Sequence, residues 1–157
     1  MRFLLSIEKS VGSVIFRKNE NGEKEFLLLR YRNGHWDFSR GHVDVGETEQ
    51  TTLLRELVEE TGITELAIIP EFRQSIFFYY RARAGEAVRR KQEKRSCNVI
   101  KKAVYYLGET SQSAVVLSPE HMEYAWLPYE QALARITYAG AKKIIRKAYD
   151  FMKKHHI

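Results

Sequence analysis

The chain has 157 residues, a formal net charge of +6 and a hydrophobic content of 44%, which is the composition of one folded domain and not of a disordered protein. No apolar run approaches the roughly 20 residues that a membrane helix needs, and the N-terminal FLLSI is too short for an export signal. The one cysteine, Cys97, excludes an internal disulfide, so we expect a cytoplasmic, monomeric protein with no membrane partner and a single domain over residues 1–157.

The first part of the chain consists of short β-favouring runs. We expect strands at Val11–Phe16 and Phe26–Arg30, joined across a turn at Asn21-Gly22. A second turn at Asn33-Gly34 leads into a strand at His35–Phe38 and then into a glycine-containing loop.

A helix is predicted next, from about Thr48 to Gly62. Three glutamates share one face of it because they stand at i, i+3 and i+4: Glu56, Glu59 and Glu60. The opposite face is apolar: Leu54, Leu57 and Val58. Three anions this close repel one another unless a cation lies among them, and clustered carboxylates suit Mg2+ or Mn2+. The alternative is a solvated acidic face, which does not explain the glycines before the helix or Arg55 beside Glu56.

Strands and helices also alternate in the second half of the chain. Strands are predicted at Ala67–Ile69, Arg73–Arg81, Asn98–Leu107 and Tyr124–Leu127, and helices at Tyr129–Ile136 and from Gly140 to about Lys154. This order predicts an α/β (α+β) fold, a mixed sheet between the glutamate helix and the C-terminal helix.

The positive charge is concentrated in one segment, residues 81–102, which holds nine Lys or Arg and two Glu. Its net charge is +7, and the rest of the chain sums to −1. Such a run is either a mobile, solvated loop or an electrostatic funnel for a substrate that carries phosphates. A nucleic-acid contact is possible but not favoured, because the segment lacks interleaved aromatic residues.

The segment GHVDVGETEQTTLLRELVEETGI, residues 41–63, resembles the Nudix box, G-x5-E-x7-R-E-U-x-E-E-x-G-U with U aliphatic, and it meets every fixed position. Members of that family hydrolyse nucleoside diphosphates linked to another group and use divalent metals. The resemblance implies the same α/β/α sandwich and a set of metal ligands: Glu56, Glu59, Glu60 and the main-chain carbonyl near Gly41. It also implies that Arg55 braces Glu56 and the loop of Glu47; a weak surface salt bridge is the alternative.

Further segments are similar to those of the asymmetric dinucleoside tetraphosphate hydrolases within this family: LSPEHMEYAWL at 117–127, KKAVYYLGE at 101–109, ITYAGAKKII at 136–145, and EFLLLR before His35-Trp36. This subgroup splits diadenosine tetraphosphate into ATP and AMP. The likeness makes Glu120 a candidate metal ligand or general base, with a solvated loop carboxylate as the alternative. The expected catalytic residues are Glu59, Glu56, Glu120 and Arg55.

In the same subgroup one adenine is stacked between aromatic rings, and basic residues hold the phosphates. Carried over to this chain, the substrate-binding residues are Arg40, His35, His42, Tyr79, Tyr80, Lys102 and Tyr138. For the tyrosines, ordinary packing is the alternative.

Two departures bear on the substrate. Ser39-Arg40 stands where the subgroup has Pro-Lys, and residues 83–100 form a longer and more basic insertion than the short turn expected there. The insertion favours an alternative substrate, a nucleoside triphosphate or an RNA 5′ end. A Nudix-fold module that binds without turnover is disfavoured, because such modules are expected to lose box glutamates and all are present here.

Overall fold

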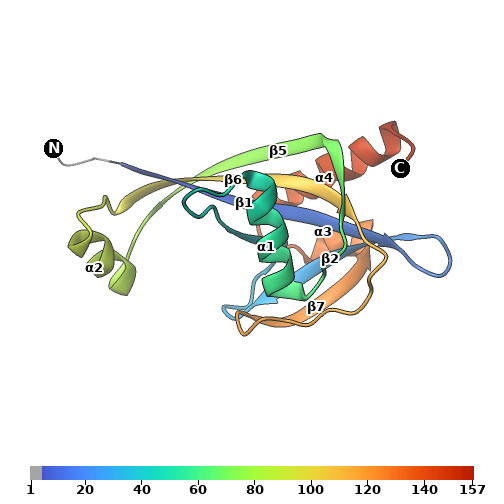
Figure 1. The fold of residues 1–157 in the computed structure, drawn as a ribbon, viewed down its shortest axis with the longest axis horizontal. Helices are drawn as coiled ribbons and strands as arrows, with labels where there is room; N and C mark the ends of the chain where they lie inside the picture. The colour runs from blue at the N-terminus through green and yellow to red at the C-terminus, as the bar shows by residue number, and fades with distance from the viewer. Residues whose placement is uncertain (1–4) are drawn as a thin grey trace.

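The computed structural model of the protein describes residues 5–157, so Phe3 and Leu4 of the FLLSI segment lie outside the described residues. Within that range the chain forms seven strands and four helices (Figure 1). In chain order they are β1 (Ser6–Lys18), β2 (Lys24–Tyr31), β3 (Trp36–Asp37), β4 (Ser39–His42), α1 (Glu49–Thr61), β5 (Ala67–Arg81), α2 (Ala84–Gln92), β6 (Asn98–Glu109), β7 (His121–Pro128), α3 (Tyr129–Arg135) and α4 (Ala139–Lys154).

The strands form one mixed sheet whose central path runs β3-β2-β1-β6-β5, with β4 paired to β1 and β7 paired to β2. Strand β1 pairs with β6 in parallel, and on its other side it has two different antiparallel partners. Ser10–Ser13 pair with β4, whereas Phe16–Lys18 pair with β2. The sheet therefore forks along β1, and β4 occupies the branch that faces α1.

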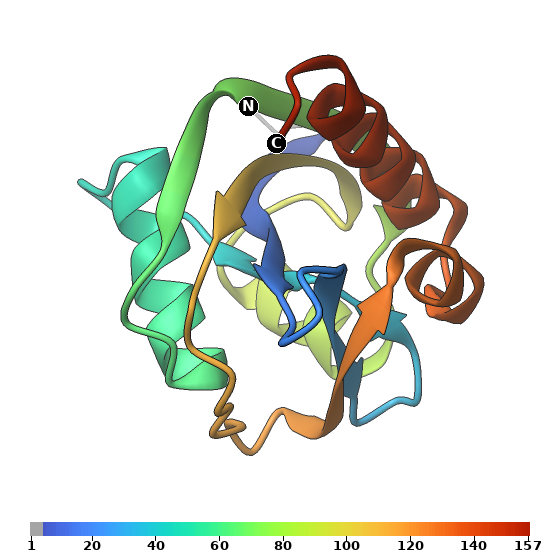
Figure 2. The ribbon, with the colours of Figure 1, turned by 90° about the vertical axis from the view of Figure 1, so that its right-hand side faces the viewer.

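Helices cover both faces of the sheet, α1 on one side and α4 on the other (Figure 2). Side chains alternate along β1 and β6, so each strand serves both layers. Val11 and Val104 pack with Leu53 of α1, whereas Val14 and Tyr105 belong to the cluster that includes α3 and α4. This is the predicted sandwich, a mixed sheet between the glutamate helix and the C-terminal helix.

Two local expectations were wrong. The predicted glycine-containing loop is strand β4, because its backbone pairs with Ser10–Ser13. The two strands predicted between Ala67 and Arg81 are one, β5, with an irregular register between Ile68 and Arg73. Pro70 lies in that irregular stretch, on the edge strand of the sheet, where its missing N–H is tolerated.

The basic insertion is an ordered helix, α2, and not a solvated loop. Arg90 is only 2% exposed, and its guanidinium donates to Glu86 at 2.8 Å and also binds Glu8. Arg95 reaches the same Glu8 carboxylate at 2.6 Å. The Glu86–Arg90 spacing is visible in the sequence, but Glu8 lies more than 80 residues away and gives no local signal. Within residues 5–157, none of the helices combines the length and the hydropathy needed to span a membrane.

Candidate active site

Helix α1 presents the glutamates to the sheet. It begins after Thr48, whose hydroxyl accepts a hydrogen bond from the N–H of Thr51, and it ends at Gly62 in the left-handed conformation. Its buried face differs from the expected one, since Leu54 and Val58 are 41% and 46% exposed. The buried residues are Thr52, Leu53, Leu57, Glu60 and Thr61. The helix is thus rotated so that the edge of its acidic face lies against β4.

Gly41 of β4 makes this close approach possible. A Cβ atom added to Gly41 would lie 1.8 Å from Cδ of Glu56, so no other residue fits here without displacing that carboxylate. On the neighbouring residue of β4, the backbone N–H of Arg40 donates to Oε2 of Glu60 at 3.2 Å. Two box glutamates are therefore held directly against one short strand.

Arg55 gathers the remaining acidic groups. Its Nε and Nη2 bind both oxygens of Glu47 at 2.7 and 2.9 Å, and its Nη1 lies 2.7 Å from Glu56 and 3.3 Å from Glu59. Nη2 also donates to the carbonyl of His42 at 3.0 Å. These are the contacts expected of a brace that fixes the loop before α1 and orients Glu56.

Burial and mutual repulsion make the carboxylates unusual acids. Glu60 is 3% exposed, and burial, reinforced by the charges of Glu56 and Glu120, raises the pKa of its carboxyl to about 8. Burial likewise raises the pKa of Glu56, and the charges of Glu59 and Glu120 add to the effect. A divalent cation would relieve this repulsion, and the all-oxygen donors fit Mg2+ or Mn2+. In residues 5–157, no three His, Cys, Asp or Glu side chains already form a metal-binding group. Arg55 instead provides the cation between Glu56 and Glu59.

Glu120 approaches the carboxylates from the loop before β7. It is exposed, and its backbone is fixed by a hydrogen bond from its N–H to the hydroxyl of Ser118 and by another from the N–H of Arg32 to its carbonyl. The same loop is tied to α1, because the backbone N–H of Ser118 donates to the carbonyl of Glu60 at 3.2 Å, and the charge of Glu120 raises the pKa of both Glu56 and Glu60.

His121 is a candidate functional residue that the sequence analysis did not select. It is 5% exposed, its Nδ1 lies 3.1 Å from the hydroxyl of Ser118, and its Nε2 lies 3.8 Å from Oε1 of Glu60. Its ring edge contacts Tyr31 at 4.4 Å between centroids. Among the described residues, this buried Nε2 has no hydrogen-bond partner. The Glu120-His121 pair in the 117–127 segment was the available signal.

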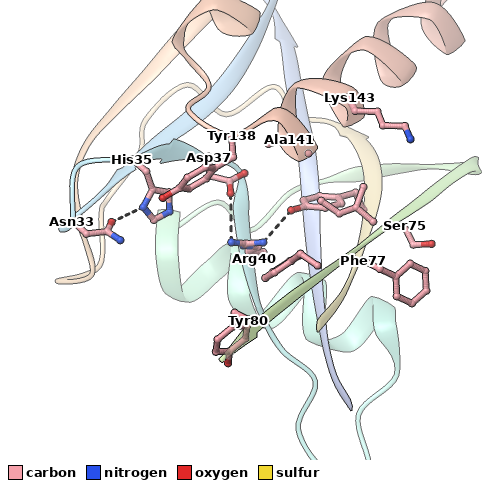
Figure 3. A pocket seen from close by; sticks show the side chains of 14 residues that line it. Asn33, His35, Asp37, Arg40, Ser75, Phe77, Tyr80, Tyr138, Ala141 and Lys143 are labelled. Carbon is pink, nitrogen blue, oxygen red and sulfur yellow. Dashed lines mark hydrogen bonds and ion pairs between the residues drawn. The ribbon is translucent and has the colours of Figure 1, made fainter. Parts of the chain in front are cut away.

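A cavity of about 1080 Å³ lies on the α4 face of the sheet (Figure 3). Aromatic and basic side chains line it, among them His35, Arg40, Phe78, Tyr80, Tyr138 and Lys143. The ring of His35 is stacked on Tyr31 at 4.5 Å and lies 5.3 Å from Tyr138. Burial lowers the pKa of His35, which favours the neutral imidazole.

Arg40 connects the cavity to the glutamates. Its backbone binds Glu60, while its guanidinium points into the cavity, 3.5 Å from Asp37 and 3.3 Å from the hydroxyl of Tyr105 (Figure 3). The same guanidinium lies 5.8 Å from the ring centre of Phe78. A ligand in the cavity thus meets a fixed cation one residue away from Gly41.

The sheet separates the predicted substrate residues into two groups. Arg40, His35, Tyr80 and Tyr138 line the cavity. His42 lies beside that face through a 3.3 Å contact between its Nε2 and Nζ of Lys101. Tyr79 and Lys102 do not line the cavity, since the alternation of β5 and β6 turns them to the opposite face. There the Tyr79 hydroxyl donates to Asn98, and Nζ of Lys102 lies over the ring of Phe77.

Lys101, and not Lys102, lies on the cavity face of β6. It is the cross-strand partner of Phe78 on β5, which lines the cavity, so the two side chains lie on the same face of the sheet. Burial lowers the pKa of Lys101, and the positive charge of Arg40 lowers it further. Two cations held near each other on one face indicate a site for an anion.

The comparisons with known proteins agree with this geometry. The family model described as NUDIX domain matches residues 8–148. The bis(5′-nucleosyl)-tetraphosphatase [asymmetrical] of Mus musculus is 32% identical over 155 residues, which cover 92% of this chain and 95% of that protein. An RNA pyrophosphohydrolase of Sulfurovum sp. is 29% identical over 150 residues and 92% of both chains. The crystal structure of a C. elegans Ap4A hydrolase binary complex superimposes with a TM-score of 0.76 at 31% identity, over 94% of this chain and 98% of that one.

Proposed function

The chain belongs to the Nudix family of hydrolases, and we propose that it splits diadenosine tetraphosphate asymmetrically into ATP and AMP. The observation that carries the proposal is the position of Arg40, which lines an aromatic and basic cavity and binds Glu60 on the glutamate face of α1 through its backbone N–H. The cavity suits a nucleoside with a polyphosphate chain, and the cluster suits the divalent metal that Nudix hydrolases generally use.

The carboxylates have the metal-binding role. We assign the metal ligands to Glu56, Glu59, Glu60, Glu120 and the carbonyl of Gly41. Mg2+ or Mn2+ bound there would neutralise charge on the phosphate oxygens and acidify a water molecule. Arg55 acts on the geometry, because its fork holds Glu47 and Glu56 in place.

The cavity residues position the substrate. His35, Phe78 and Tyr138 offer ring faces to one adenine, and stacking on such faces is worth about 1–3 kcal/mol per base. Arg40 and Lys101 lie between that cavity and His42, where a phosphate chain running toward the glutamates would pass. The protein thus fixes the base at one end and the scissile phosphate at the other.

Glu120 acts either as a metal ligand or as the general base, and kinetics of one variant distinguish these two roles. If Glu120 is a metal ligand, Glu120→Gln raises the metal concentration needed for half-maximal activity. If Glu120 is the general base, the variant lowers kcat at saturating metal and leaves the metal requirement unchanged.

The product analysis tests the whole proposal. The protein is incubated with diadenosine tetraphosphate and Mg2+ in water labelled with heavy oxygen, and the products are identified by mass spectrometry. Equal amounts of ATP and AMP, with label in one of them, support the proposal, and loss of turnover in a folded Glu59→Gln variant separates hydrolysis from mere binding. Release of two ADP, or no cleavage with either Mg2+ or Mn2+, contradicts it.

A second substrate is favoured by helix α2, namely a nucleoside triphosphate or a triphosphorylated RNA 5′ end. The helix extends the cavity side of the sheet, because Tyr80 in the cavity donates from its hydroxyl to Glu86 of α2 at 3.0 Å. Relative kcat/KM values for the dinucleotide, a nucleoside triphosphate and a triphosphorylated RNA decide between the two.

A further inference from the structure

The sheet face opposite the cavity carries large apolar side chains that no helix covers. At the end of the sheet where β1 begins and β5 ends, Phe77, Tyr79 and Ile7 are 65%, 63% and 75% exposed. Alternation and register place them on one surface, since Ile7 pairs with Ile100 and Phe77 pairs with Lys102. Helix α1 crosses the same face farther along the strands, where Leu53 packs on Val104 (Figure 1). We call the exposed part the β5–β6 platform: Ile7, Phe77, Tyr79, Ile100 and Lys102.

The two aromatic rings of the platform are positioned, not loose. Nζ of Lys102 lies 5.6 Å from the ring centre of Phe77, and the Tyr79 hydroxyl donates to Asn98 of the neighbouring strand at 2.9 Å. Residues two apart on one strand are separated by about 6.6–6.8 Å. Phe77 and Tyr79 therefore present two ring-bearing positions in a row, beside a cation.

The carboxylates near the platform are already neutralised. Glu49, at the start of α1, is held by Lys9 at 2.5 Å, by Arg73 at 2.7 Å and by the hydroxyl of Tyr106. Asp44 and Glu47, in the loop before α1, both bind Arg55. The platform thus offers no free acidic group to a partner.

The adjoining segment adds unpaired positive charge. Its two glutamates, Glu86 and Glu93, bind Arg90 and Arg95. Five further cations have neither an ion pair nor a hydrogen bond from their side chains within residues 5–157: Arg81, Arg83, Arg89, Lys91 and Lys94. Arg81 ends β5, two residues after Tyr79 on the same strand.

We propose that the β5–β6 platform binds single-stranded nucleic acid, with bases stacked on Phe77 and Tyr79 and phosphates contacting Lys102 and the cations of residues 81–94. Exposed aromatic side chains on a sheet, flanked by Lys and Arg, are how proteins hold unpaired bases. A second copy of this chain is the disfavoured occupant, since it would bring two positively charged surfaces together. The inference goes beyond dinucleotide hydrolysis, because Phe77 and Tyr79 alternate along β5 with the cavity residues Phe78 and Tyr80; Phe77 also borders the cavity from this edge strand, whereas Tyr79 does not line it.

The test is fluorescence anisotropy of the full chain with a labelled, 5′-hydroxyl oligouridylate of about 12 nucleotides, which offers no 5′ phosphate to hydrolyse. The double variant Phe77→Ala/Tyr79→Ala is expected to bind at least about 25-fold more weakly, since each stacked base is worth roughly fivefold or more. Lys102→Ala is expected to weaken binding severalfold and to reduce the salt dependence by about one phosphate contact. Phe77→Tyr should retain binding, because it keeps the ring. Tyr124→Ala, an exposed tyrosine on β7, is the matched control and should bind like the wild type.

Measuring hydrolysis beside oligonucleotide binding distinguishes the platform from the catalytic site. Diadenosine tetraphosphate hydrolysis should be unchanged in the single variant Tyr79→Ala, because Tyr79 does not line the cavity. Equal binding of oligouridylate and oligothymidylate supports the inference as a single-strand site, and a preference for either one also supports it. No binding by the wild type, or equal binding by the double variant, overturns it. So does a wild-type dimer in sedimentation that the double variant converts to a monomer, because the platform would then be a self-interface.

Discussion

Lys101 and Lys102 are adjacent on β6 but point to opposite faces of the sheet, so their variants test which face binds the substrate. Lys101 lies on the cavity face beside His42, and Lys102 lies on the opposite face over Phe77. We expect Lys101→Ala to raise KM for diadenosine tetraphosphate about tenfold, because a lost contact between charged groups is worth about 1.4 kcal/mol or more. Lys102→Ala should change KM less than twofold. Steady-state kinetics of the two variants checks this, and a larger effect of Lys102→Ala would show that the phosphates lie on the other face.

Gly41 tests how closely α1 must approach β4. Gly41→Ala is expected to lower kcat at least tenfold and to raise the metal requirement, because the new Cβ collides with the carboxyl of Glu56. A ligand displaced in this way typically costs about 10–100-fold in metal affinity. Activity is measured across a Mg2+ titration. Gly85→Ala is the matched control, since no atom lies within 4 Å of the added methyl group there, and wild-type kinetics of Gly41→Ala would contradict the assignment.

At the residue scale, the sequence predicted the charged groups on α1 better than it predicted which side chains line the cavity. The three box glutamates and Arg55 follow from their spacing, because residues on one helix face meet whatever the rest of the fold does. Phe78 and Lys101 could not be chosen over Tyr79 and Lys102, because strand alternation defines two faces without saying which one borders the cavity. His121 was missed because its distance to Glu60 depends on the loop that joins β6 to β7.

At the scale of elements, the first turn of α1 is attached to the sheet by Glu49. Hydrogen bonds from Arg73 above all, and then from Lys9 and Tyr106, hold the pKa of Glu49 well below its usual value. A carboxyl whose pKa is lower in the folded state stabilises the fold above its unfolded pKa, and this stabilisation is lost as the pH falls through the folded pKa. We expect Glu49→Gln to lower the free energy of unfolding by about 1–2 kcal/mol at pH 7.

The pH dependence identifies the cause of that change. The difference between wild type and Glu49→Gln should be constant from about pH 6 to 8 and should shrink below the ordinary glutamate pKa of 4.5. Urea unfolding at several pH values measures it. Glu130→Gln, in the first turn of α3 and without an ion pair in the described chain, is the control and should differ little from the wild type. A difference that persists unchanged at pH 3 would attribute the effect to packing.

Elements with a strong local pattern were predicted, and those that depend on distant partners were not. The apolar stripe of α4 and the caps of α1 are local, so both helices were placed to within a few residues. Helix α2 depends on Arg90 binding Glu8 of β1, and β4 depends on pairing with Ser10–Ser13 of the same strand. Neither partner is close in sequence, so both segments resembled loops.

At the scale of the whole molecule, charge and fold are separable. Residues 81–102 carry +7, and the rest of the chain sums to −1. Arg81 and Asn98 are already cross-strand partners, so a two-residue Asn-Gly turn in place of residues 82–97 closes the β5–β6 hairpin without the helix. The replacement removes six cations and two anions, which lowers the net charge from +6 to about +2. The cavity residue Phe78 and its cross-strand partner Lys101 are retained.

The variant with the Asn-Gly turn in place of residues 82–97 should show whether α2 contributes to electrostatic attraction of a polyanion or to its cleavage. For a triphosphorylated RNA, we expect wild-type kcat/KM to fall about tenfold or more between 50 and 300 mM salt, and the variant to fall less than about threefold from a lower starting value. For diadenosine tetraphosphate the two proteins should differ much less, because the residues proposed to hold its short polyphosphate chain, Arg40 and Lys101, are retained. Glu8 loses two partners in the variant, so the melting temperature is measured alongside. Identical salt dependence of RNA cleavage would mean that α2 only stabilises the end of the sheet. A steep slope in the wild type alone would make α2 the element that directs nucleic acid to a Nudix site.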